Sequence, residues 1–290
     1  MEKCIEKSFL VQLEKQNIKE DVIKSLELCI LDIESNIKNV NKIINKIELA
    51  WGVTESPFAL LHKKEKKLVI KVHPAYFSKN FRDLADPIQR VETIRTLFDH
   101  ESFEAIQNNK YNVSIFNILW TFNSLFQNDK FEDENYNSIE LCCRNTVYDI
   151  KTDRQILKLS HGPNGLRNLY NIFHQKELHY LNGVRCIRYN NRYSVNFNIK
   201  DLTKLIISAA RKTVIMEEIS GINPKLHQAR FKIHSHYTIL NKILRFPELK
   251  VLAYSLYNEL KKKYPNWKIA SEKALEIEEL LTYNEFSQLS

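Results

Sequence analysis

Residues 20–51, EDVIKSLELCILDIESNIKNVNKIINKIELAW, contain the longest hydrophobic repeat in the chain. Its aliphatic residues recur at alternating spacings of three and four, which is the a/d pattern of a helix seam. These residues are Ile23, Leu26, Ile30, Ile33, Ile37, Val40, Ile44 and Ile47. One helix over the whole stretch would be roughly 48 Å long, at about 1.5 Å per residue. Gly52 follows directly, where a C-cap glycine is common. The pattern therefore predicts one long N-terminal helix over 20–51.

Such a helix can either pair with a second chain or pack inside a helical core. One flank of the seam carries charged residues, as a two-chain coiled coil requires: Glu27, Glu34 and Glu48. The other flank widens the apolar stripe, as internal packing requires: Val22, Cys29, Asn36 and Ile43. We favour internal packing, with residues 2–16 as a shorter partner helix. A protein partner or homodimer through helix 20–51 is the alternative.

The composition of the 290-residue chain is that of a helix-rich globular protein. Hydrophobic residues make up 43% and charged residues 27%, while only 5 Gly and 7 Pro are available for tight turns. No apolar run approaches the length of a membrane span and no signal-peptide pattern opens the chain, so we expect neither. The five cysteines show no CxxC spacing, which favours a reducing cytoplasm over secretion.

Positive charge is concentrated in one segment. Residues 160–264 hold 18 basic and 6 acidic side chains, a net of +12. Residues 1–159 hold 23 basic and 24 acidic side chains, and residues 265–290 hold 2 and 5. A local surplus of this size attracts polyanions, so segment 160–264 predicts nucleic-acid binding. A solvated surface without a polyanionic partner is the alternative interpretation.

Alternating, turn-bounded runs predict β-hairpins over 56–72, 147–159 and 185–197. Helical patterns begin at Asp86-Pro87, cover 112–127 and dominate 200–283, where they predict a helical bundle. The acidic loop at 128–137 separates an N-terminal helical lobe, 1–130, from a basic C-terminal lobe, 138–290. The fold class predicted is mostly α (α+β).

The hairpin 185–197 combines cations with aromatic rings. Guanidinium groups bind phosphates and rings stack on unpaired bases, so RNA is favoured over DNA. The candidate contacts here and elsewhere in the basic segment are Arg167, Arg185, Arg188, Tyr189, Arg192, Tyr193, Lys212 and Lys232. Upstream, His161-Gly-Pro-Asn-Gly165 precedes a predicted helix, and such a turn can bind phosphate through backbone N–H groups. It matches no phosphate-loop motif, so an ordinary turn is favoured.

The run Arg230-Phe-Lys-Ile-His-Ser-His236 lies in a predicted helix over 224–245. An Arg that stabilises a phosphorane and a His that moves a proton suffice for metal-independent RNA cleavage. Five residues separate Arg230 from His236, which resembles the R-x(4–6)-H signature of HEPN domains, helical bundles that often act as dimeric ribonucleases. Phe231 stands where that family usually has Asn, Asp or His. The resemblance implies catalytic roles for Arg230 and His236, within the last 90 residues.

Two other functions stay open. The chain can be a non-enzymatic subunit of a larger nucleoprotein or defence-type assembly. Glu140, Asp149 and Lys151 loosely match the carboxylates and lysine of a metal-dependent nuclease. The histidines and cysteines show no zinc-binding spacing, so the sequence predicts no metal and no cofactor.

Overall fold

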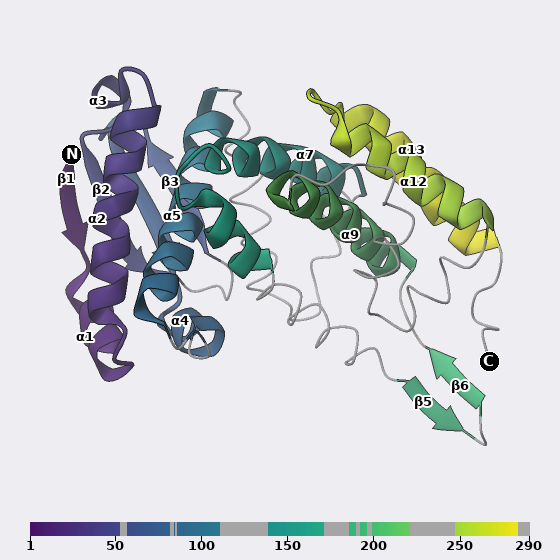
Figure 1. The fold of residues 1–290 in the computed structure, drawn as a ribbon, viewed down its shortest axis with the longest axis horizontal. Helices are drawn as coiled ribbons and strands as arrows, with labels where there is room; N and C mark the ends of the chain where they lie inside the picture. The colour runs from purple at the N-terminus through teal and green to yellow at the C-terminus, as the bar shows by residue number, and fades with distance from the viewer. Residues whose placement is uncertain are drawn as a thin grey trace. The chain divides into compact units, whose positions relative to one another are not determined.

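A computed structural model describes residues 1–52, 57–81, 84, 86–110, 139–170, 186–189, 192–195, 199–220 and 247–283. The described chain is mostly helical, with a small four-stranded mixed sheet and a two-stranded one (Figure 1). It divides into two compact units. Unit 1 comprises Met1–Tyr136 and Thr152–Leu169, and unit 2 comprises Asn137–Lys151 and Tyr170–Ser290. The fold is therefore of the mostly α (α+β) class that the sequence predicts.

The four-stranded sheet belongs to unit 1 and has the order β1-β2-β4-β3. Its strands are β1 (Glu2–Ile5), β2 (Lys46–Trp51), β3 (Phe58–His62) and β4 (Lys67–Val72). β2 is parallel to both β1 and β4, while β3 is antiparallel to β4. Parallel neighbours need a crossover connection. Between β1 and β2 it consists of α1 (Lys7–Lys15), α2 (Lys19–Asn36) and α3 (Val40–Ile43).

The predicted single helix over 20–51 is wrong beyond Asn36. Asn39 has φ 57°, a left-handed conformation that no helix interior accepts. Residues Lys46–Trp51 then alternate as a strand, with Ile47 and Leu49 fully buried. Backbone pairing to strands on both sides stabilises this conformation. The predicted helix over 2–16 is likewise replaced by β1 and α1.

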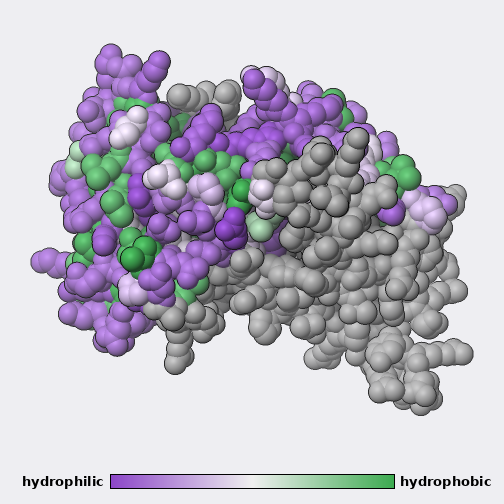
Figure 2. Space-filling view, viewed as in Figure 1, coloured by the Kyte–Doolittle hydropathy of each residue, from purple (hydrophilic) through white to green (hydrophobic). Residues whose placement is uncertain are grey.

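The hydrophobic seam of α2 packs inside the chain, as the sequence predicts. Its residues Val22, Leu26, Cys29 and Ile33 are fully buried. The helix lies along α5 (Pro87–Lys110), and the two run side by side across the sheet (Figure 1). In the view of Figure 2, the described surface over these elements is mainly hydrophilic, with hydrophobic groups in small patches. The seam of α2 therefore contributes to the core of its own chain.

The predicted hairpin over 56–72 and the predicted helix start at Asp86-Pro87 are confirmed. β3 and β4 pair across a turn in which Lys66 has φ 48°. The carboxylate of Asp86 accepts a 3.0 Å hydrogen bond from the backbone N–H of Ile88, which caps α5. Between them, α4 (Pro74–Phe81) adds Phe77 and Phe81 to the aromatic core.

The predicted hairpin over 147–159 is wrong, because residues 147–156 belong to helix α7 (Ile139–Ile156). Cys143, Val147 and Ile150 are buried at spacings of four and three, which is a helical period. A turn over 157–161 and a helix over 162–170 follow. The residues of α7 up to Lys151 belong to unit 2 and the rest to unit 1.

In unit 2, α9 (Ile199–Ser220), α12 (Pro247–Lys261) and α13 (Trp267–Tyr283) pack together. β5 (Cys186–Tyr189) and β6 (Arg192–Val195) pair antiparallel where the sequence predicts the hairpin 185–197. The predicted helices over 112–127 and 224–245 lie outside the described residues. No helix in the described parts of the chain is long and apolar enough to cross a membrane.

Candidate functional sites

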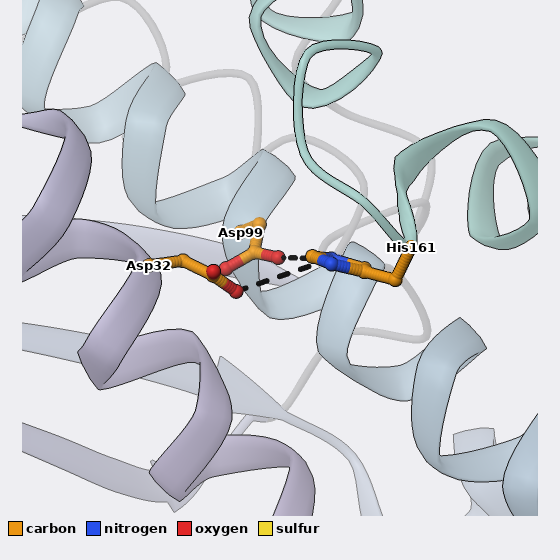
Figure 3. A group of neighbouring side chains, drawn as sticks. All are labelled: Asp32, Asp99 and His161. Atoms are coloured by element: carbon orange, nitrogen blue, oxygen red, sulfur yellow. Dashed lines mark hydrogen bonds and ion pairs between the residues drawn. The ribbon is translucent and has the colours of Figure 1, made fainter.

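Two groups of side chains stand out, one in each unit. The first, the acid–histidine cluster, consists of Asp32, Arg95, Asp99 and His161. Asp32 comes from α2, Arg95 and Asp99 come from α5, and His161 ends the turn between α7 and the helix 162–170. In Figure 3 the carboxylates of Asp32 and Asp99 and the ring of His161 point toward one another. All three residues are buried.

Hydrogen bonds join the cluster in two pairs, His161 with Asp99 and Arg95 with Asp32, and a longer ion-pair distance separates His161 from Asp32. Nε2 of His161 lies 2.9 Å from Oδ2 of Asp99 and 4.0 Å from Oδ2 of Asp32. The guanidinium of Arg95 donates to both carboxylate oxygens of Asp32, each at 2.6 Å. This bidentate pairing holds the Asp32 carboxylate in one orientation.

The electrostatics of the cluster are dominated by burial. Burial raises the pKa of Asp99 to about 6, the hydrogen bond from His161 opposes the shift, and the nearby charge of Asp32 adds to it. Oδ1 of Asp99 and Nδ1 of His161 are both buried, and no described group hydrogen-bonds to either. The protein therefore leaves two polar atoms of this cluster unsatisfied, a condition that is rare in buried sites.

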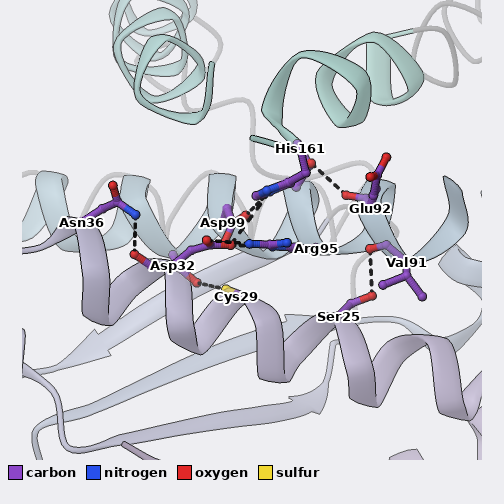
Figure 4. A network of polar contacts seen from close by, with 11 residues as sticks. Ser25, Cys29, Asp32, Asn36, Val91, Glu92, Arg95, Asp99 and His161 are labelled. Carbon is purple, nitrogen blue, oxygen red and sulfur yellow. Dashed lines mark hydrogen bonds and ion pairs between the residues drawn. The ribbon is translucent and has the colours of Figure 1, made fainter. Parts of the chain in front are cut away.

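The polar network extends along the interface of α2 and α5 (Figure 4). Sγ of Cys29 lies 3.8 Å from Oγ of Ser102, and Ser25 donates to the carbonyl of Val91 at 3.0 Å. Burial, with the charge of Asp99, raises the pKa of the Cys29 thiol. Cys29 is thus a neutral thiol beside the cluster at physiological pH.

Two glycines let the turn carrying His161 approach the helices closely. A Cβ on Gly165 would lie 1.8 Å from Oγ1 of Thr96, and one on Gly162 would lie 1.8 Å from the carbonyl oxygen of Ile156. The N–H of Gly162 donates to Leu159 and that of Gly165 to His161. The sequence predicts a turn over 161–165, whereas the structure begins the helix 162–170 at Gly162, and both glycines lie in its first turn, where they allow close packing. Arg167, in the next helical turn, is exposed.

The sequence analysis did not single out Asp32, Arg95 or Asp99. A signal was present, because Val91, Arg95, Asp99 and Ser102 recur at spacings of four, four and three along α5. Polar residues that continue a buried helical stripe need partners from another element. The sequence alone does not identify those partners, since Asp99 and His161 are 62 residues apart.

The second group, the basic turn, covers residues 261–268 in unit 2, from the last residue of α12 to the second residue of α13, with the sequence KKKYPNWK. Buried Glu259 organises it by accepting from Lys262 at 2.5 Å and from the backbone N–H of Asn266 at 3.0 Å. The side chain of Asn266 then caps α13 by accepting from the backbone N–H of Lys268 at 3.0 Å. These hydrogen bonds fix the conformation of the turn that carries the lysines.

Cations and rings alternate over the basic turn. Tyr264 exposes 77% of its surface, and Nζ of Lys263 lies 5.4 Å from its ring centroid. Trp267 is half-buried between the guanidinium of Arg144, at 5.6 Å, and Nζ of Lys268, at 5.8 Å. These are cation–π distances. Lys262, Lys263 and Lys268 are exposed, and the turn contains no acidic residue.

The other predicted nucleic-acid contacts are distributed more widely. In the β5–β6 pair, Arg188 is the register partner of Tyr193 and Arg192 is the partner of Tyr189, so each arginine lies opposite a tyrosine. Lys212 on α9 is only 8% exposed, and burial makes it unsuitable for contacting a nucleic acid. Arg185, Arg230, Lys232 and His236 lie outside the described residues.

The arrangement of a metal-dependent nuclease does not form at Glu140, Asp149 and Lys151. All three lie on α7, and Glu140 and Asp149 are about 13 Å apart along its axis. Asp149 pairs with the guanidinium of Arg211, while Nζ of Lys151 lies 5.2 Å from the ring centroid of Tyr148. These two carboxylates are too far apart to bind one cation.

Searches against protein-family models, curated proteins and solved structures found no match to this chain.

Proposed function

We propose that this protein binds nucleic acid, single-stranded RNA in preference to duplex DNA, through its basic C-terminal unit. The observation that carries the proposal is the basic turn 261–268, where exposed lysines surround an exposed tyrosine without an acidic neighbour in the turn. Lysines neutralise phosphates and release counterions, which supplies affinity for any nucleic acid. An exposed ring adds stacking that only unpaired bases accept.

Three further features support the same surface chemistry. The segment 160–264 has 12 more basic than acidic side chains. The N-terminus of α13 adds the positive end of a helix dipole beside Lys268. The pairing of Arg188 with Tyr193 and of Arg192 with Tyr189 repeats the cation–aromatic combination on the β5–β6 ribbon.

We propose a cytoplasmic location for this protein, since the described cysteines, Cys4, Cys29, Cys142 and Cys143, are free thiols.

The deciding experiment measures binding of the purified protein to single-stranded RNA and to duplex DNA over a range of salt concentrations. For wild type we expect a steep fall in affinity with salt. The double substitution Lys263→Gln with Lys268→Gln should lower the log–log salt slope by about 1.4 for a single strand, since each lost phosphate contact removes about 0.7.

A matched control is Lys24→Gln with Lys38→Gln, which removes the same charge from exposed positions in unit 1. This control should retain the wild-type slope. Equal loss in both double variants would show that net charge, rather than the basic turn, drives binding. No binding at low salt would refute the proposal and leave a protein-interaction subunit as the function to test.

Ribonuclease activity is a separate part of the proposal, based on Arg230 and His236. The same RNA probe, incubated in EDTA, tests for metal-independent cleavage. Loss of cleavage in His236→Ala with binding retained would assign the general acid/base role to His236. Binding without cleavage in wild type would instead favour a non-enzymatic subunit of a nucleoprotein assembly.

A further inference from the structure

We propose that Asp32, Asp99 and His161 bind a divalent transition-metal cation within unit 1. The proposal is independent of nucleic-acid binding. One ligand atom from each residue, two carboxylate oxygens and one imidazole nitrogen, lie within 4.8 Å of one another. Oxygen and imidazole donors in this combination suit Mn²⁺, Fe²⁺ and Zn²⁺.

The separations of the donor atoms agree with coordination. Nε2 of His161 is 2.9 Å from Oδ2 of Asp99 and 4.0 Å from Oδ2 of Asp32. Ligand bonds of about 2.1 Å place adjacent octahedral ligands roughly 3.0 Å apart and opposite ones roughly 4.2 Å apart. A cation can therefore replace the hydrogen-bonding proton between His161 and Asp99 with little movement of either side chain.

Arg95 is hydrogen-bonded to Asp32, whereas Oδ1 of Asp99 has no hydrogen-bond partner among the described residues. Asp99 is fully buried. Figure 3 shows the carboxylate of Asp99 turned toward that of Asp32. Two buried carboxylates in this arrangement repel each other. A bound cation relieves this repulsion.

Arg95 supports the site and does not block it. Its guanidinium bonds both oxygens of Asp32 and so orients that carboxylate, as partners behind metal ligands commonly do. Arg95 neutralises one of the two carboxylates and leaves the charge of Asp99 for a cation. The side chains of Arg95 and Asp32 are 17% and 11% exposed. Solvent at this edge partly screens the guanidinium.

The cation would connect parts of unit 1 that are distant in sequence. Its ligands belong to α2, to α5 and to the turn that precedes the helix 162–170. A cation that binds only the folded state raises its stability with increasing concentration. The expected role is structural, because all three ligands are buried.

Mn²⁺ is the probe of choice, because it prefers oxygen and nitrogen donors over the thiols of this chain. The full-length protein is stripped with a chelator, and bound Mn²⁺ is measured by the loss of its free electron paramagnetic resonance signal. We expect one Mn²⁺ per chain and a Tm that rises with Mn²⁺ concentration and falls back on adding EDTA. The exposed-histidine control His62→Gln should behave as wild type.

Asp99→Asn is the decisive variant, since its amide oxygen still accepts from His161 while the charge is removed. We expect this variant to fold, to keep or raise its metal-free Tm at pH 7 and to lose the response to Mn²⁺. His161→Gln should lose the response as well. A wild-type protein that binds neither Mn²⁺ nor Zn²⁺, or an Asp99→Asn variant that responds as wild type does, would overturn the proposal.

Discussion

At the scale of single residues, Tyr264 is the side chain on which discrimination between unpaired and paired bases depends. Its ring is 77% exposed, so its removal leaves the core intact. Tyr264→Ala should weaken binding to single-stranded RNA by about 5- to 150-fold, which corresponds to about 1–3 kcal/mol of stacking. Fluorescence anisotropy with a labelled oligonucleotide measures the change.

Tyr264→Phe is the matched control, because it keeps the ring and should bind nearly as wild type. Duplex DNA, whose bases are already stacked, should lose little affinity in either variant. An equal loss on single-stranded and duplex probes would mean that Tyr264 contributes to the shape of the turn and does not stack on a base.

Burial lowers the reactivity of the Cys143 and Cys29 thiols. Burial raises the pKa of the Cys143 thiol to about 12, with a smaller contribution from Cys142. At pH 8 the thiolate fraction of Cys143 is then on the order of 10⁻⁴, and only the thiolate is nucleophilic. We expect Cys143 and Cys29 to resist a thiol-labelling reagent in the native protein and to react fully in guanidinium. Rapid native labelling of Cys143, located by peptide mass spectrometry, would contradict this assignment.

At the level of secondary-structure elements, the hydrophobic spacing of three and four in 20–51 continues from helix α2 into strand β2. Ile44 and Ile47 continue the spacing of the α2 seam, yet they enter the core from the C-cap of α3 and from strand β2. The break between these structures is Asn39, whose φ is 57°. Asparagine tolerates this left-handed conformation better than other residues that carry a side chain.

Substitutions at Asn39 distinguish this break from a continuous helix. Asn39→Gly should be neutral or stabilising by up to about 1 kcal/mol, whereas Asn39→Ala should destabilise by about 1–2 kcal/mol. A helix running through this position would reverse the order, since Ala favours a helix interior over Gly by about 1 kcal/mol. The free energy of unfolding in urea measures the difference.

In helix α7 the error is the reverse: short apolar runs predict a strand, and the structure has a helix. The sequence predicts a strand at Val147–Ile150, because a polar turn over Lys151–Arg154 separates these residues from the next apolar run. Their spacing of three fits a helix equally well. Burial of Cys143, Val147 and Ile150 along one face decided the outcome.

At the scale of the whole molecule, the chain passes between its two units more than once. Residues Thr152–Leu169 return to unit 1 after Asn137–Lys151 have contributed to unit 2. In unit 1, Leu166 and Leu169 are buried, and Asn168 bonds both Gln89 and Thr93 on α5. No single cut therefore separates the two units intact.

A fragment covering 1–136 should fold poorly, because it loses His161 and the helix 162–170 and uncovers the buried polar face of α5. A fragment covering 1–170 keeps these contacts and should show the higher Tm. Circular dichroism with thermal unfolding compares the two. Equal stability of both fragments would show that the return segment 152–169 is dispensable for unit 1.

Features that depend on neighbours close in the chain could be predicted from the sequence. These are the helical character, the start of α5 at Asp86-Pro87, the β3–β4 hairpin and the inward face of α2, since periodicity and capping act over a few residues. The strand conformation of Lys46–Trp51 depends on tertiary contacts, because its partners are β1 and β4. It also assembled Asp32, Asp99 and His161, because contacts between residues more than 60 positions apart leave no local spacing to read.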